Sequence, residues 1–448
     1  MNPELSLLYT NSDRIGYGRL GVKLNEALTK LGVNVHTVHA GGHDMPPPTN
    51  VLGYVSLPTH TRRWYDGQYK FMYTMWETDK LPDIFTSLLH NFDLLIVPSE
   101  ENRELYSQHH PNVHYVPLAI DSTDWAFLPR TPDRRYFRFL ISGSGDRKGC
   151  DLAYKAFNAA FPYPGSMSRI PILMMKANRI MNYDGEYIEN FVGKVSMERE
   201  IEIYSMADCY VQPSRGEGFG FQPLQAIAQG IPTILTDAHG HRAYSHLSPW
   251  KLSTVKAPVE YNMLGYADNQ HWWEPDFDEL VDAMRDVYKV AETVVTQQIC
   301  REASSLAHMM FNWETTALNV KTLLAERVCI PYSGTGEIQE MEQPKYLIRV
   351  NRPYTLHAAG DTLVFEPGKD YYEIVDIKRV MYESDLLDPS CLSPDAESGL
   401  TDAQIAELPH YLSRNAFCPT CGTQYNTGVH KSQAFLNGNL TREDLKIE

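Results

Sequence analysis

Residues 211–236 read VQPSRGEGFGFQPLQAIAQGIPTILT, and the rest of the chain can be interpreted outward from this stretch. An apolar run ends in a Pro-Ser turn, and a glycine-rich loop follows at residues 216–220. Pro223 suits the first turn of a helix, apolar residues recur at helical spacing, and Gly230 ends the helix. Residues 232–235 predict a buried strand. The pattern therefore predicts a loop, a helix and a strand, with backbone N–H groups at a helix N-terminus, where phosphate is favoured.

The composition bounds the class of protein. The chain has 448 residues, enough for two or three domains, and 43 % of them are hydrophobic. A net charge of −16 argues against general binding to nucleic acid or to an anionic membrane. The first residues lack a basic, apolar leader pattern, and no run reaches the ~18 apolar residues of a membrane span. Seven scattered cysteines favour a reducing cytoplasm.

The first half opens as a βαβ unit. Residues 5–9 and 33–38 predict strands, and residues 19–30 between them predict a helix. The intervening loop carries Gly16 and Gly18 in a G-x-G-x-x-G pattern, which suggests a dinucleotide fold. A nicotinamide-dependent dehydrogenase needs an acidic residue at the end of the second strand to bind the ribose, and none is present there. We therefore give little weight to a dehydrogenase.

Glu77 follows another predicted strand, residues 70–75, in the phrase WETDKLP. Acids at the carboxyl end of a strand face the crevice of an open α/β sheet. Glu77 is therefore a candidate for acceptor contact or proton transfer, and a solvated loop acid is the alternative.

A second βα unit begins after the first half. Residues 137–142 predict a strand, residues 151–161 predict a helix, and the loop between them reads GSGDRKG. Arg147 and Lys148 in this loop are candidate phosphate ligands, with two solvated cations as the alternative.

The stretch at residues 211–236 resembles the motif of retaining GT-B glycosyltransferases (glycosyl transferases group 1, family 4-like), E-G-F-G-L-x-x-x-E-A-x-A-x-G-x-P. Glu217 is the first acid of the motif, and Ala226, Ala228, Gly230 and Pro232 match further positions. Gln225 occupies the place of the second acid, which in the family holds the ribose of the sugar nucleotide. The phrase around Glu77 resembles a signature in a subset of the same family.

The resemblance implies an α/β fold of GT-B architecture, in which two Rossmann-like domains face a cleft, with a small β-containing C-terminal module appended. The expected domains are residues 1–125 on the acceptor side, 126–312 on the nucleotide-sugar side, a crossover helix and linker at 313–332, and the module at 333–448.

The resemblance also implies a reaction: transfer of a sugar from a nucleotide-diphosphate-sugar donor, UDP or GDP sugar, to an acceptor hydroxyl with retention of configuration. Glu217 and Glu77 are the expected catalytic residues. The expected donor-binding residues are Arg147, Lys148, Gly218, Phe219, Gly220, Gln225, Gly16 and Gly18. No cofactor or metal is required for this chemistry when cations and a helix dipole neutralise the diphosphate.

Other functions stay open at this stage. A non-catalytic GT-B protein that binds sugar or nucleotide fits the missing second acid. A GT-B phosphorylase or epimerase fits the same motifs. The acceptor is not identified by the sequence: a protein, a glycan, a small molecule, a lipid head group and a modified nucleic acid base are all compatible, with a macromolecule such as a protein or glycan weakly favoured. A homo-oligomer is compatible with the sequence as well.

Residues 333–448 lie outside the family pattern. Short strand-like runs separated by Pro and Gly predict a small β module. Cys418 and Cys421 form half of a zinc-knuckle signature, but a structural zinc needs four ligands and no second C-x-x-C exists, so zinc is not expected.

Overall fold

The computed structural model describes residues 3–10, 16–39, 44–60, 63–129, 135–177, 183, 185–193, 195–259, 270–340 and four short strands beyond them. Its chain groups into two compact units. The first unit comprises Met1–Asp79, Leu89–Ala257 and His271–Glu340, and the second comprises Lys80–Leu88, Pro258–Gln270 and Met341–Glu448.

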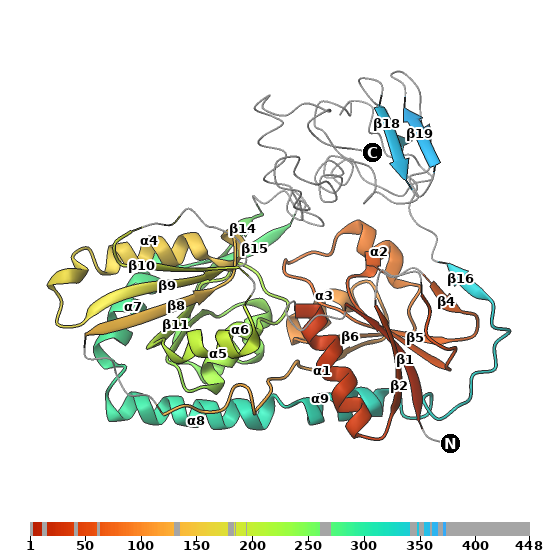
Figure 1. Ribbon diagram of the computed structural model, residues 1–448, viewed down its shortest axis with the longest axis horizontal. Coiled ribbons are helices and arrows are strands. Elements are labelled where there is room, and N and C mark those ends of the chain that lie inside the picture. Colours follow the sequence, from red (N-terminus) through yellow and green to blue (C-terminus); the bar gives the residue numbers. More distant parts are fainter. Residues whose placement is uncertain are drawn as a thin grey trace. The chain divides into compact units, whose positions relative to one another are not determined.

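The first half of the first unit is a six-stranded parallel sheet in the order β2-β1-β3-β5-β6-β7 (Figure 1). Its strands are β1 (Glu4–Tyr9), β2 (Asn34–His39), β3 (Val51–Val55), β5 (Tyr69–Tyr73), β6 (Leu94–Val97) and β7 (Val113–Tyr115). The helices of this half are α1 (Gly16–Lys30) and α3 (Glu100–Ser107); α2 (Asp83–Leu89) lies almost entirely in a segment of the second unit. The central strands are buried, as the continuous apolar run of β6 requires of a parallel strand.

Helix α1 begins earlier than the sequence pattern predicts. Gly16 and Gly18, expected in a loop, lie in its first turn, and Gly18 is buried. The last glycine of the pattern is required by packing, because a Cβ on Gly21 would lie 2.3 Å from the Tyr9 ring. The third glycine of the pattern therefore allows α1 to pack closely against β1.

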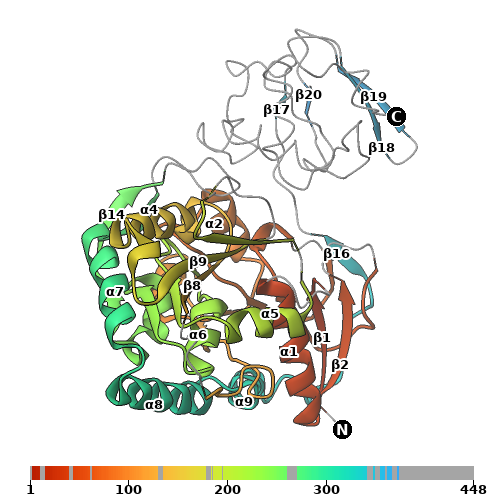
Figure 2. The same cartoon turned by 60° about the vertical axis from the view of Figure 1, so that its left-hand side comes forward.

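The second half is another six-stranded parallel sheet, in the order β10-β9-β8-β11-β12-β13. Its strands are β8 (Tyr136–Ser142), β9 (Ile170–Ala177), β10 (Ile188–Val192), β11 (Cys209–Gln212), β12 (Thr233–Thr236) and β13 (Trp250–Leu252). The helices are α4 (Cys150–Ala160), α5 (Met197–Ser205), α6 (Phe221–Ala228) and α7 (Phe277–Val290). Figures 1 and 2 show α4 on one side of this sheet and α5 and α6 on the other.

Alternating side chains of β8 divide between two cores. Phe137 and Phe139 pack in a cluster with residues of α4 and α7, whereas Leu140 packs in a second cluster with residues of α5 and α6. This second cluster continues into the first half through α1, so one hydrophobic core is shared by both halves. The predicted α/β fold with two Rossmann-like halves is confirmed.

Two helices lead back from the second half to the first, namely α8 (Val294–Met310) and α9 (Trp313–Leu323). Helix α9 packs on α1, and Lys321 Nζ donates to the Leu31 carbonyl at 2.8 Å. Farther on, the Val328 carbonyl accepts from the backbone N–H of Glu4 at 2.9 Å. Residues late in the chain thus complete the first half.

The segment after α9, expected to be a linker, is bound to the first half. Tyr332 Oη donates to Asp66 Oδ1 at 3.0 Å, and the Thr335 N–H donates to Asp66 Oδ2 at 3.0 Å. Strand β16 (Ile338–Glu340) then pairs antiparallel with β4 (Arg63–Tyr65).

The remaining described strands are short. A two-stranded ribbon joins β14 (Thr254–Pro258) to β15 (His271–Pro275). In the tail, β17 (Leu347–Ile348) pairs with β20 (Tyr371–Tyr372), and β18 (Tyr354–Ala358) pairs with β19 (Asp361–Phe365). Cys418 and Cys421 lie outside the described residues.

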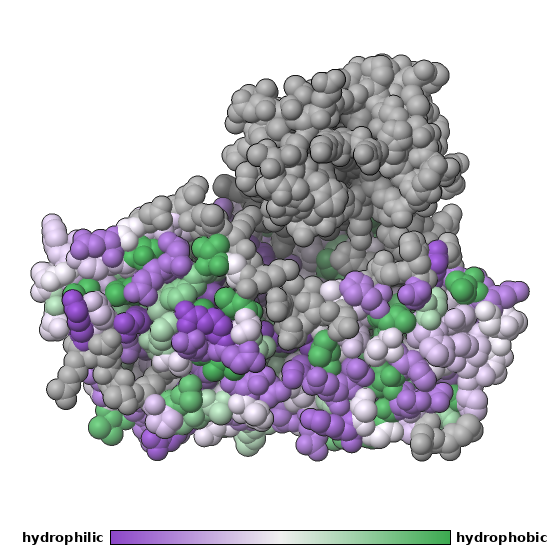
Figure 3. Space-filling view, viewed as in Figure 1, coloured by the Kyte–Doolittle hydropathy of each residue, from purple (hydrophilic) through white to green (hydrophobic). Residues whose placement is uncertain are grey.

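Across the part of the chain that is described, no helix combines the length and the apolar character that a membrane crossing requires. Figure 3 shows hydrophilic and hydrophobic residues interspersed over the described surface in that view.

Candidate functional site

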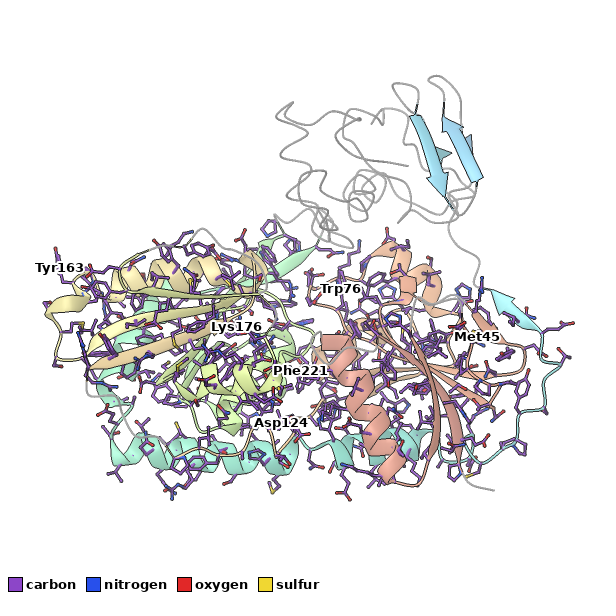
Figure 4. The ribbon with its side chains drawn as sticks, viewed as in Figure 1. Met45, Trp76, Asp124, Tyr163, Lys176 and Phe221 are labelled. Atoms are coloured by element: carbon purple, nitrogen blue, oxygen red, sulfur yellow. The ribbon has the colours of Figure 1, made fainter. Side chains whose placement is uncertain are left out.

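A cleft of about 620 Å³ lies where the two halves of the first unit meet, at the carboxyl ends of their strands. The first half contributes Gly16, Tyr17, Arg19, Met75, Glu77 and Leu118 to its lining. The second half contributes the end of β9, residues of the loops after β8, β10 and β11, and the first turns of α5 and α6. In Figure 4, Lys176 at the end of β9 and Phe221 at the start of α6 mark two of these elements. Open α/β sheets bind ligands at this edge.

Four of the predicted site residues meet in one ionic cluster in this cleft. Lys148 Nζ lies 2.6 Å from Glu217 Oε1, and Arg147 Nη1 lies 3.5 Å from Glu217 Oε2. The same Arg147 nitrogen lies 3.6 Å from Glu77 Oε1, so the arginine bridges acids of both halves. Ser214 Oγ donates to Glu217 Oε1 at 2.8 Å. The cluster joins residues that are up to 140 positions apart in the sequence, from Glu77 to Glu217.

Glu217 is buried and ionised. Burial by itself would raise the pKa of this carboxyl, but the positive charges of Lys148 and Arg147 outweigh burial and lower the pKa to about 2. A carboxylate with so low a pKa holds no proton to donate at neutral pH. Both of its oxygens contact basic side chains, so Glu217 orients Lys148 and Arg147 in addition to lining the cleft.

The loops that carry this cluster pack so closely that a Cβ at Gly149 or Gly216 would clash with a backbone oxygen. Gly149, directly after Lys148, has a φ of 70°, and a Cβ there would lie 2.0 Å from the Pro213 carbonyl oxygen. A Cβ on Gly216 would lie 2.1 Å from the Glu77 carbonyl oxygen. The backbone of the glycine-rich loop therefore touches the first half, and larger residues are excluded there.

Helix α6 begins at Phe221 rather than at Pro223, which is its third residue. Five other helices have a Ser, Thr, Asp or Asn side chain that caps the N-terminus: α3, α5, α7, α8 and α9. Helix α6 instead starts after Gly220, at a φ of 85°, with no side-chain cap and no acid in its first turn. Its first N–H groups and its dipole are therefore left for an anion in the cleft. The Phe219 ring is buried, so only its backbone can serve a ligand.

Asn102 holds the glycine-rich loop from the first half, a role that the sequence did not reveal. Its Oδ1 accepts from the Trp76 N–H at 2.7 Å, and its Nδ2 donates to the Gly218 carbonyl at 3.1 Å. Asn102 is fully buried at the start of α3.

Arg215, directly before the loop, was also missed. It pairs with Asp151 at 2.8 Å and with Glu274, and it donates to the Asp146 carbonyl. The guanidinium thus ties the loop before α6 to the loop that carries Arg147 and Lys148.

A second charged cluster lines the same cleft. Glu200 on α5 contacts Lys176 Nζ through Oε1 at 3.0 Å and Arg19 Nη2 through Oε2 at 3.3 Å. All three side chains line the cleft, although Glu200 is only 8 % exposed.

Gln225, the expected ribose ligand, is 1 % exposed and is not among the described residues that line the cleft. With its amide oriented toward the neighbouring donors, its oxygen accepts from Trp125 Nε1 at 3.2 Å and from Arg19 Nη1 at 2.5 Å. Arg19 thus lies between Gln225 and Glu200.

His239 and His241 lie behind the glycine-rich loop. His239 Nδ1 bonds to the Glu217 carbonyl at 2.6 Å, and its ring stacks on Trp273. Burial lowers the pKa of both imidazoles to about 4, so both are neutral at pH 7. Neither is among the described lining residues, which favours a structural role.

Within the described residues, no group of three or more His, Cys, Asp and Glu side chains is arranged to hold a metal ion.

Comparisons with known proteins bear on the family and the fold. The Glycosyl transferases group 1 family matches residues 179–245, which include the glycine-rich loop and α6. A protein of Acidianus filamentous virus 1 with a provisional glycosyltransferase name, ORF313, is 28 % identical over 169 residues. That match covers 35 % of this chain and about half, 49 %, of the viral protein.

Solved structures show the same fold at low identity. Sucrose-phosphate synthase of Thermosynechococcus elongatus has a TM-score of 0.51 and 14 % identity, over 72 % of this chain and 98 % of that one. The α,α-trehalose 6-phosphate synthase of Burkholderia multivorans has a TM-score of 0.52 and 11 % identity, over 73 % and 99 %. An E. coli structure described as "Trehalose-6-phosphate" bound with UDP-2-fluoro glucose has a TM-score of 0.50 and 10 % identity, over 73 % and 100 %.

Proposed function

From the premise that this chain has a GT-B fold and carries a Glycosyl transferases group 1 domain, we propose that it transfers a sugar from a nucleotide-diphosphate-sugar donor to an acceptor hydroxyl. The proposed reaction retains the anomeric configuration, as the resemblance to retaining GT-B transferases implies. A UDP sugar is the first donor to test, because the E. coli neighbour carries a UDP-sugar analogue.

One observation carries the proposal: Arg147 and Lys148 line the same cleft as the uncapped N-terminus of α6. A leaving nucleoside diphosphate gains negative charge as its bond to the sugar breaks. Two cations that Glu217 holds in place and a helix N-terminus can stabilise that charge without rearranging.

Glu217 keeps the two cations in place. An isolated lysine or arginine at the cleft would rotate freely, whereas Lys148 and Arg147 are held on one buried carboxylate. Glu77, on the other side of Arg147, belongs to the first half and is the proposed contact for the acceptor. In such a site, positioning and charge stabilisation supply most of the rate enhancement.

The function is tested by donor binding followed by turnover. A thermal-shift panel of UDP, GDP, TDP, ADP, NAD and their sugar conjugates identifies the donor, since a ligand at a hundred times its Kd adds about 2.7 kcal/mol of stability. Product analysis with the best donor then reports transfer. We expect the double variant Arg147→Ala, Lys148→Ala to lose at least ~100-fold in kcat.

The control for that variant is Lys155→Ala, because Lys155 is an exposed cation on α4 outside the described cleft lining. Turnover by the double variant at the rate of the control would remove Arg147 and Lys148 from the diphosphate site. A shift with NAD alone would overturn the transferase assignment.

A non-catalytic sugar- or nucleotide-binding protein is the second candidate. The observation in its favour is Gln225, which replaces the family acid and is engaged with Trp125 and Arg19. This candidate predicts a thermal shift with a nucleotide sugar and no transfer or hydrolysis of the sugar.

A further inference from the structure

The nucleotide part of the proposed donor needs a group that recognises the ribose, and Gln225 is badly placed for this. An amide oxygen has two lone pairs, and donors from Trp125 and Arg19 occupy both on Gln225. A ribose hydroxyl that approached Gln225 would therefore find no free acceptor.

Glu200 has what Gln225 lacks. An ionised carboxylate accepts about four hydrogen bonds, two on each oxygen. Lys176 occupies one position on Oε1 and Arg19 occupies one on Oε2, which leaves one acceptor position on each oxygen. Two adjacent acceptors match the two O–H donors of a vicinal diol such as the ribose 2′- and 3′-hydroxyls.

The two cations also fix the direction of the carboxylate. Lys176 comes from the end of β9, and Arg19 comes from α1 of the other half, so Glu200 is held from two sides. All three side chains are at most 14 % exposed. A carboxylate held in this way needs little ordering when the ligand binds, which favours affinity.

The position of Glu200 relative to the phosphate cations is also suitable. Lys176 pairs in register with Ser142, the last residue of β8, and its carbonyl accepts from the Gly143 N–H at 2.9 Å. The loop that follows Gly143 carries Arg147 and Lys148. The Glu200 cluster therefore lies one strand away from Arg147 and Lys148. This order matches a nucleoside diphosphate, in which the ribose is bonded directly to the diphosphate.

We propose that Glu200, rather than Gln225, is the residue that binds the ribose hydroxyls of the nucleotide. The assignment rests on the proposed function, since it requires a nucleoside diphosphate in the cleft. Acidic side chains have this role at the ribose in other Rossmann-like sites.

The test measures the affinity of the full chain by calorimetry for a ribonucleoside diphosphate and for its 2′,3′-dideoxy form. The nucleotide used is whichever of UDP, GDP and ADP gives the largest thermal shift. We expect the wild type to bind the ribo form about tenfold more tightly, which corresponds to about 1.4 kcal/mol. In Glu200→Gln we expect this ratio to fall to about one through loss of affinity for the ribo form alone.

Two further variants complete the design. Glu202→Gln removes an exposed carboxylate from the same helix, outside the described cleft lining, and should leave the ratio unchanged. Glu200→Asp keeps the charge but withdraws it by one methylene, and should give an intermediate ratio. Dideoxy binding that is retained in each variant shows that the site is folded.

The outcomes separate the two proposals. If the tenfold ratio persists in Glu200→Gln, the ribose is recognised elsewhere and only the assignment of Glu200 is overturned. If none of the three nucleoside diphosphates binds the wild type, the proposed function itself is wrong.

Discussion

Replacing Glu217 by Gln should destabilise the protein by an amount that depends on pH. The pKa of this carboxyl is lowered from its ordinary value of 4.5 to about 2 in the folded chain. At about 1.36 kcal/mol per pKa unit, the difference between the unfolded and folded pKa of Glu217 corresponds to about 3.4 kcal/mol of stability at pH 7. The side chain is 7 % exposed, so solvent screening reduces this figure little. Removing one partner of a buried ion pair typically costs 3–5 kcal/mol, in agreement with this value.

The sign of the pH dependence follows from the lowered pKa. The stabilisation is fully present above pH 4.5 and is lost as the pH falls through about 2, where the folded carboxyl takes up a proton. At pH 3 about 1.4 kcal/mol of it remains. The difference between wild type and Glu217→Gln should therefore shrink by about 2 kcal/mol between pH 7 and pH 3.

The assay is urea unfolding of wild type and variant at pH 7, 5, 4 and 3, with the difference in unfolding free energy plotted against pH. Other carboxyl groups titrate in both proteins and cancel in that difference. Glu202→Gln, at an exposed carboxylate that pairs with Arg199 on the same helix turn, is the control and should show no such pH dependence. A Glu217→Gln difference that stays constant from pH 7 to pH 3 would refute the claim that this carboxylate is buried and ionised.

Three further predictions concern the groups that hold the cleft together. Gly149→Ala should lower the unfolding free energy by at least ~2 kcal/mol, because of left-handed backbone strain and a clash with the Pro213 carbonyl. Gly32→Ala is the control: its φ is 79° and the space around it is open, so it should show the backbone strain alone. Equal melting temperatures for the two variants would contradict this prediction. Arg215→Lys should cost ~2–3 kcal/mol in denaturant unfolding, because lysine cannot bind Asp151 and Glu274 together. Asn102→Ala should cost ~2 kcal/mol and weaken donor binding in calorimetry, because the Trp76 N–H and the Gly218 carbonyl lose their partner; donor affinity equal to wild type would show that the loop holds its shape without Asn102.

The glycine-rich loop and the two parallel sheets could be predicted from the sequence because they depend on local patterns. Gly216 and Gly220 occupy positions where the backbone must turn or closely approach a neighbour. Buried strands such as β6 are recognisable as continuous apolar runs. The convergence of Glu77 with Arg147 followed from the topology, since both come after strands whose carboxyl ends face the cleft.

The residues that were missed depend on contacts between distant parts of the chain. Arg215 is defined by acids that are 64 and 59 positions away, and no local pattern distinguishes it from a solvated loop cation. Glu200 lies in an amphipathic helix among other charged residues, where a buried acid resembles an exposed one. Strand β3 contains Gly53, and glycine is a weak strand former, so the local sequence gives little indication of this strand. Glycine is required at this position because a Cβ would lie 2.3 Å from the Phe71 ring.

The completion of the first half by residues 313–340 has a consequence for synthesis on the ribosome. Helix α9 covers part of α1, and the carbonyl of Val328 binds the N–H of Glu4, so these contacts form only after the second half has been translated. At ~5–20 residues per second, the ~200 residues between the two parts take roughly 10–40 s to emerge. During that time the part of α1 that contacts α9 in the finished molecule is uncovered, although α1 can already pack on β1 and β3. Substitutions that make this face more apolar should therefore lower the yield of folded protein before they alter the finished molecule.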